Sequence, residues 1–121
     1  MAVVRYLVED ADAAATFYVD ALGFTVERRI GTAFTFVSRG NLMVWLSGPE
    51  TSAARPMPNG DQPVPGGWNR LVIEVDDLDA AVARLRAANA HFRNEPITGP
   101  GGRQVLVEDP SGNPIEIFQP A

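Results

Sequence analysis

The sequence contains no cysteine and no lysine, and it has one histidine, His91, among its 121 residues. Without cysteine there is no disulfide, no thiolate metal ligand and no cysteine nucleophile. Without lysine there is no Schiff base and no phosphate-binding loop of the Walker type. A lone histidine also excludes any site that needs two imidazoles from one chain.

Positive charge is scarce as well, because ten arginines stand against fifteen acidic residues, for a net charge of −5. Nucleic acids and anionic membranes both bind clustered cations, so we expect neither as a partner. The start of the chain shows no leader pattern, and no apolar run is long enough to span a membrane, which favours a cytoplasmic protein. The composition, 45% hydrophobic and 21% charged, is typical of a globular domain, and the length suits a single domain over 1–121.

Two stretches 67 residues apart resemble each other: 8–14, VEDADAA, and 75–81, VDDLDAA. Each follows a short apolar run and precedes apolar residues at helical spacing. Each predicted helix has a residue suited to cap its start and one suited to a left-handed turn at its end: Asp10 and Gly23 for the first, Asp77 and Asn89 for the second. We therefore interpret the chain as a duplication.

Short β-type runs surround each helix, namely 3–8, 24–27, 33–37 and 42–46 in the first copy, and 71–75, 91–93, 104–107 and 115–118 in the second. Each copy is thus predicted to be a βαβββ module, the first over 1–47 and the second over 68–121, joined by a linker at 48–67 rich in proline and glycine. One helix covers only one face of a sheet. We expect an α+β fold in which two tandem βαβββ modules form a curved mixed sheet that encloses a cavity, with the helices outside.

Three motifs carry a family resemblance: 8–10, VED, before the first helix; 17–24, FYVDALGF, within it; and 109–116, DPSGNPIE, near the end. Tandem βαβββ modules with these motifs resemble the vicinal oxygen chelate superfamily. That superfamily includes glyoxalase I, extradiol dioxygenases, fosfomycin-modifying enzymes and bleomycin-resistance proteins. The resemblance covers nearly the whole chain outside the linker and implies a homodimer. It does not imply one activity, since the superfamily supports many chemistries on one scaffold.

The resemblance also implies where metal ligands would lie, one in the first and one in the last strand of each module. Enzymes of the superfamily use His, Glu and related ligands there for a divalent ion. The corresponding residues here are Val3, Arg70 and Glu116, with Trp45 or its neighbour Val44 as the fourth. Only Glu116 can ligate a metal, and a guanidinium beside it would repel a cation. We therefore expect no metal and no other cofactor.

Strand alternation predicts which side chains face the cavity. They include two arginines, two glutamates, two aromatic residues and a methionine, and they are the candidate ligand-binding residues: Arg5, Met43, Trp45, Arg70, Glu74, Glu116 and Phe118. Apolar walls with a few orienting charges are typical of small-molecule sites. The expected partner is therefore a small organic molecule.

Plainer interpretations exist for these residues. In one interpretation, Arg70 and Glu116 form an ion pair with each other and fill the space that a metal ion would occupy. Trp45 is either core filling or a stacking surface, and Arg5 and Glu74 lie in the cavity or at its solvent-exposed rim. Glu116 is the one candidate for a general base, but that role needs a raised pKa, which an adjacent arginine opposes.

Two residues outside this set, Trp68 and His91, also have expected positions. Trp68, at the end of the linker, closes the pocket or lies in a subunit contact. His91 is expected in a surface loop after the second helix.

Three functions remain open on these grounds. The first, which we favour, is a metal-free binding protein of the glyoxalase/bleomycin-resistance type that holds a small organic ligand between the modules. The second is an enzyme, either a metal-dependent lyase or dioxygenase or a metal-free isomerase or hydrolase that uses Glu116. The third is a dimer-forming module whose cavity has lost its use.

Overall fold

The computed structural model describes all residues, Met1–Ala121. In chain order the elements are β1 (Ala2–Leu7), α1 (Ala11–Leu22), β2 (Thr25–Ile30), β3 (Phe34–Arg39), β4 (Leu42–Ser47), the 3-10 turn η1 (Ser52–Ala54), β5 (Leu71–Glu74), α2 (Leu78–Ala87), β6 (His91–Phe92), β7 (Ile97–Gly99), β8 (Gly102–Glu108) and β9 (Pro114–Pro120). All of the predicted helices and strands are present. The sequence did not indicate β7 or η1, and β7 is a short strand that pairs only with β8.

The helix ends form as the capping residues predict. The Asp10 carboxylate accepts hydrogen bonds from the backbone N–H groups of Asp12 and Ala13, and the Asp77 carboxylate accepts one from Ala80. Gly23 has a φ of 75° and Asn89 a φ of 59°, so both adopt the left-handed conformation that ends a helix. The two copies of the repeat therefore fold alike at the local level.

The strands form two mixed sheets. Sheet A has the order β1-β4-β3-β2, and sheet B has the order β5-β9-β8-β6, with β7 added on β8. In each sheet the first strand pairs in parallel with the last strand of its module, and the other pairs are antiparallel. This is the α+β arrangement of two βαβββ modules that the duplication predicts.

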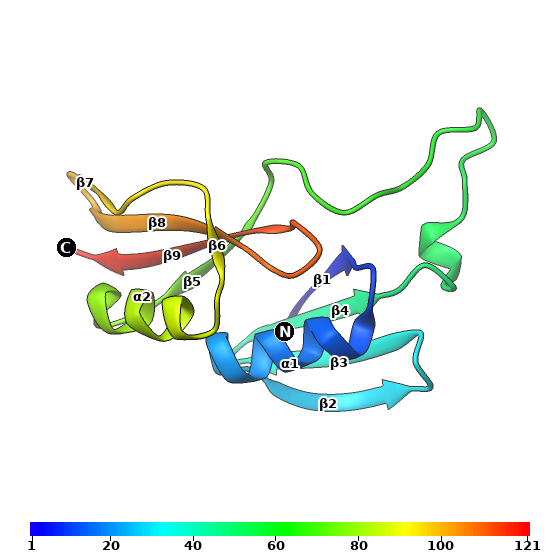
Figure 1. The fold of residues 1–121 in the computed structure, drawn as a ribbon, viewed down its shortest axis with the longest axis horizontal. Helices are drawn as coiled ribbons and strands as arrows, with labels where there is room; N and C mark the ends of the chain where they lie inside the picture. Colours follow the sequence, from blue (N-terminus) through cyan, green and yellow to red (C-terminus); the bar gives the residue numbers. More distant parts are fainter.

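Both helices pack into one hydrophobic core of 21 buried residues drawn from both modules. The helices meet near their C-terminal ends, where the Arg84 guanidinium donates to the carbonyl oxygen of Asp20 at 2.8 Å (Figure 1). Between the sheets, the Tyr6 hydroxyl donates to the carbonyl of Pro114 and accepts from the backbone N–H of Leu71. Side chains rather than a strand ladder thus join the two sheets.

The long connection between β4 and β5 extends away from the two modules, as Figure 1 shows in green. Its end is tied back to the second module, because the Gly66 backbone N–H donates to the side chain of Asn113 and Arg93 donates to the carbonyl of Gly67. Neither α1 nor α2 has the length and apolar character needed to cross a membrane.

Candidate functional site

Each sheet has one face against the helices and one face turned away from them, and we call the latter open face A and open face B. Alternate residues of β4, β5 and β9 are buried on the helix side, among them Val44 and Leu46 in sheet A, and Ile73 and Ile117 in sheet B. Their neighbours in the strands point the other way, and all seven candidate ligand-binding residues lie on the open faces. The predicted strand parity is correct in every one of these strands.

The strand register identifies equivalent positions in the two modules. Arg5 pairs with Trp45 across β1 and β4, and Val72 pairs with Glu116 across β5 and β9. Arg5 and Val72 are 67 residues apart, which is the offset of the repeat, so Trp45 is the counterpart of Glu116. Val44 is fully buried on the helix side and is excluded from that role.

Open face A is a packed aromatic surface around an arginine. The rings of Trp45 and Phe36 are stacked, with centroids 5.0 Å apart and an interplanar angle of 19°. The Arg5 guanidinium lies 5.1 Å from the Trp45 ring centroid and 5.7 Å from that of Phe34. The Trp45 indole N–H donates to the sulfur of Met43 at 3.3 Å. Trp45 is thus half-buried within this cluster and lies outside the hydrophobic core.

Open face B carries an ion pair instead. The Arg70 Nε and Nη2 atoms both donate to Oε1 of Glu116, at 3.1 and 3.0 Å. The Glu116 side chain is 12% exposed and the Arg70 side chain is 32% exposed, so the pair is partly shielded from water. Glu74 and Phe118 are register partners beside it. The two charges of the pair cancel at the position where the resemblance implies a metal ligand.

The two open faces do not enclose a cavity within one chain, which differs from the expected closed arrangement. The structure brings Arg5, Met43 and Trp45 together on one face, and Arg70 and Glu116 together on the other, but no contact joins the two groups. None of the five main pockets is lined by any of these residues. The reason is the shared core, because both sheets turn their helix-covered faces to it and leave the other faces uncovered.

The largest pocket lies on the helix side, between α1 and α2. It has a volume of about 530 Å³, and its lining includes Phe17, Asp20, Arg84 and several alanines. No candidate site residue reaches it.

A buried polar cluster around Asp109 was not expected from the sequence. One oxygen of the Asp109 carboxylate accepts from the backbone N–H groups of Ser111 and Asn113, and the other accepts from the Asn113 amide and from the Tyr18 hydroxyl. Asn113 also donates to the carbonyl of Leu7 at 2.7 Å. The DPSGN segment therefore locks the β8–β9 turn to β1 and α1.

Burial governs the ionisation of this cluster. Burial raises the pKa of the Asp109 carboxyl, although four hydrogen bonds from Asn113, Tyr18 and Ser111 oppose that rise. Burial also raises the pKa of the Tyr18 hydroxyl well above its usual value, and the neighbouring Asp109 charge raises it further. The buried polar side-chain atoms of this cluster all have hydrogen-bond partners within the protein, so these motif residues stabilise the fold.

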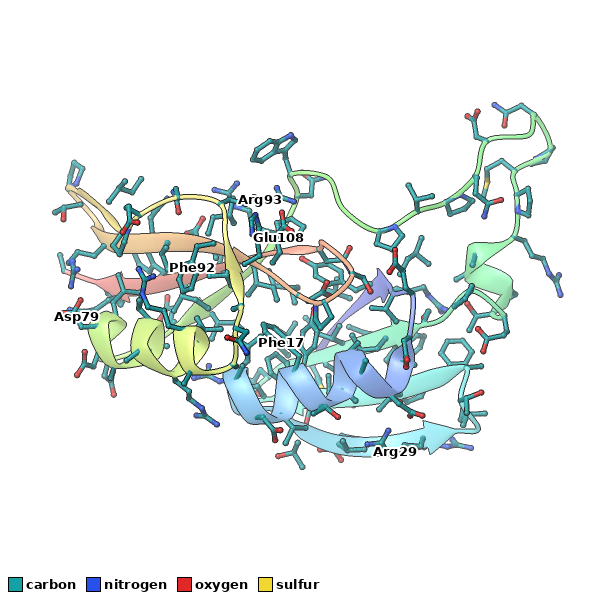
Figure 2. All side chains as sticks on the ribbon, viewed as in Figure 1. Phe17, Arg29, Asp79, Phe92, Arg93 and Glu108 are labelled. Carbon is teal, nitrogen blue, oxygen red and sulfur yellow. The ribbon has the colours of Figure 1, made fainter.

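Trp68 and His91 line the same pocket as Arg93 and Glu108. Arg93 pairs with Glu108 at 2.7 Å, and its guanidinium lies 4.7 Å from the Trp68 ring centroid. Figure 2 shows Arg93 and Glu108 side by side at the end of the long connection. His91 is exposed, as expected, and it belongs to strand β6, where it pairs with Glu108. The β-type run predicted at 91–93 is therefore present, and the expectation of a surface loop at His91 is wrong.

Comparison with known proteins decides the family. The model of the Glyoxalase/Bleomycin resistance protein/Dioxygenase superfamily matches residues 1–117. The chain belongs to this superfamily. "Uncharacterized protein YwbC" of Bacillus subtilis is 32% identical to it over 116 residues, which cover 93% of this chain and 91% of that protein.

Solved structures of the superfamily have the same fold. The antibiotic-binding protein TnmS3 from Streptomyces sp. CB03234 is 27% identical with a TM-score of 0.74, covering 98% of this chain and 93% of that one. Lactoylglutathione lyase from Agrobacterium tumefaciens is 23% identical with a TM-score of 0.77, covering 98% and 92%. The likeness to lactoylglutathione lyase, at 23% identity, shows the fold alone.

The residues at the four superfamily ligand positions do not fit a divalent metal ion. Val3 and Trp45 offer no ligand atom for a hard cation, and Arg70 carries a positive charge. The remaining Glu116 carboxylate already accepts two hydrogen bonds from that arginine. No group of three or more His, Asp or Glu side chains is gathered elsewhere in the structure.

Proposed function

We propose that this chain binds a small organic molecule on its open faces and that it does so without a metal ion. The observation that carries the proposal is the Arg70–Glu116 ion pair, which satisfies one oxygen of the only carboxylate at the four superfamily ligand positions. A carboxylate already paired with a guanidinium has little attraction left for a cation. Recognition then depends on shape, apolar contact and hydrogen bonds.

The aromatic cluster of open face A supports binding of an organic ligand. Phe34, Phe36, Trp45 and Met43 all remain partly exposed although they are large and apolar. Such a group on an uncovered surface is typical of a binding face. The antibiotic-binding function in the name of TnmS3, a relative of 27% identity, is in accord with this role.

We further propose that a second copy of the chain covers the open faces. Val3 and Val72 lie on these faces and are 47% and 52% exposed, and Trp68 in the connection is 70% exposed. Burial of such side chains favours association. A homodimer that brings two open faces together would enclose the ligand that one chain leaves in contact with water.

A thermal-shift screen tests the binding role. Wild-type protein is heated with a library of small aromatic molecules, with and without the chelator EDTA. We expect some members to raise the melting temperature, because a ligand that binds only the folded state stabilises it, and EDTA should not change that shift. If no compound raises it, or if stabilisation requires an added divalent ion, the proposal is wrong.

Sedimentation of the purified protein tests the dimer. The Val72→Asp substitution places a charge on open face B and should shift the protein to monomer and weaken ligand binding. Ala83→Asp, on the exposed side of α2, serves as the matched control and should leave both unchanged. A wild-type monomer that still binds ligand would contradict the dimer while leaving the binding role intact.

A further inference from the structure

Four residues form a straight row across open face A. Arg5 of β1 pairs with Trp45 of β4, Trp45 pairs with Phe36 of β3, and Phe36 pairs with Arg28 of β2. Neighbouring strands lie about 4.8 Å apart, so the row spans roughly 14 Å. Two aromatic rings thus lie in the middle of the sheet and an arginine lies at each end.

Neither arginine of this row has an acidic partner. Five other arginines form ion pairs, but Arg5 and Arg28 form none. Glu27, the neighbour of Arg28 in the sequence, accepts a hydrogen bond from the hydroxyl of Ser38. The row therefore carries two arginines without an ion-pair partner on a chain that is net negative.

Arg5 is also held in one orientation. Its guanidinium lies against both Trp45 and Phe34, and its Nη1 donates to the Ser47 hydroxyl at 3.3 Å. Because β4 lies between β1 and β3, Arg5 and Phe36 flank the indole of Trp45 from its two sides. The remaining guanidinium donors have no partner in the protein. A fixed cation with free donors is suited to binding a carboxylate.

We propose that open face A selects a flat aromatic ligand with an anionic group, in which the aromatic part lies over the Trp45–Phe36 pair and the anion meets Arg5. This inference rests on the proposed function and adds the chemical class of the ligand. Open face B lacks this selectivity, since its arginine is neutralised by Glu116. Arg5 is thus the residue that determines ligand charge.

A matched pair of ligands tests the inference. Naphthalene-2-carboxylate and naphthalene-2-carboxamide have nearly the same shape and differ in charge. Titration calorimetry with wild-type protein should show the carboxylate binding about 10- to 100-fold more tightly than the amide, as expected for a charge-assisted contact. Arg5→Gln should reduce that preference to less than about twofold and leave the amide affinity nearly unchanged.

Two further variants separate this role from a structural one. Arg5→Lys keeps the charge without the planar stack and should retain part of the preference. Arg55→Gln removes an exposed arginine of the connection that forms no ion pair and should change nothing. Near-ultraviolet circular dichroism of each variant checks that the aromatic cluster is still folded.

The outcomes are distinguishable. Equal affinity of the two naphthalenes for the wild-type protein, or an unchanged preference in Arg5→Gln, would overturn the inference and leave the binding role standing. If neither compound binds while other library members raise the melting temperature, the inference is again wrong. If no ligand binds at all, the proposed function itself fails.

Discussion

The two open faces have the same strand arrangement but different chemistry. Arg5 and Trp45 on open face A occupy the positions that Val72 and Glu116 occupy on open face B. One face therefore carries an unpaired cation within an aromatic cluster, and the other carries a neutralised ion pair. The duplicated frame thus fixes which positions point outward, while the residues at those positions determine the chemistry that each face presents.

The turns between the last two strands differ in the same way. In the first module the β3–β4 turn is short and exposed around Asn41, whereas in the second module the β8–β9 turn is buried around Asn113 and Asp109. The second turn makes hydrogen bonds to the first module and to the long connection. Stability is thus expected to depend on one turn far more than on its counterpart.

Asn113→Ala is the substitution with the largest expected effect. It removes hydrogen bonds to Leu7, Asp109 and Gly66 and leaves buried polar groups unpaired, so the free energy of unfolding should fall by about 2–4 kcal/mol. Asn41→Ala, in the exposed turn, should cost less than about 0.5 kcal/mol. Urea unfolding measures both, and equal losses would refute the asymmetry of the turns.

Tyr18→Phe tests the tie between the Asp109 turn and α1. The Tyr18 hydroxyl donates to Asp109 at 2.9 Å, and no equivalent exists in the second module, where Leu85 occupies the position 67 residues later. Removing the hydroxyl should lower the free energy of unfolding by about 1–2 kcal/mol near neutral pH. A stability equal to that of the wild type would show that the bond contributes nothing.

Alkaline titration sharpens the same test. Burial raises the pKa of the Tyr18 hydroxyl in the folded protein above its value near 10 in the unfolded chain. The folded protein therefore holds the hydroxyl proton more tightly than the unfolded chain does. The resulting stabilisation is complete below pH 10 and is lost as the pH rises toward the folded pKa. Tyr18→Phe should therefore lose less stability above pH 10 than the wild type does. Some loss should persist, because burial also raises the pKa of Tyr6.

A double-mutant cycle on Arg70 and Glu116 should give the smallest effect. The pair is partly exposed, so screening limits its coupling to roughly 1 kcal/mol or less. Arg70→Ala, Glu116→Ala and the double variant are compared by urea unfolding. A coupling energy of several kcal/mol would mean that the Arg70–Glu116 pair is a major source of stability for the second module, which its partial exposure does not predict.

Much of the fold could be predicted because its determinants are local. Capping by Asp10 and Asp77, the left-handed residues Gly23 and Asn89, and strand alternation depend on near neighbours in sequence. The open rather than closed arrangement depends on how α1 and α2 share a core, and no local pattern encodes that. The Asp109 cluster was missed for the same reason, since its Tyr18 partner is 91 residues away.

The site could be predicted only in part. Strand parity placed all seven candidate residues on the open faces, and the register then identified Trp45 as the counterpart of Glu116. The Arg5–Trp45–Phe36–Arg28 row was not foreseen, because it requires the pairing of four strands and the bulge that shifts β2 between Val26 and Arg28. Such cross-strand alignment exists only once the sheet has formed.

Metal analysis of the wild-type protein shows whether the four ligand positions hold a divalent ion. The protein is purified without chelators, and its content of nickel, zinc, iron and manganese is measured by mass spectrometry. Because Arg70 occupies the Glu116 carboxylate and Val3 and Trp45 supply no ligand atoms, we predict far less than one metal ion per chain. A stoichiometric ion that is lost in Glu116→Gln would show instead that Glu116 ligates a metal.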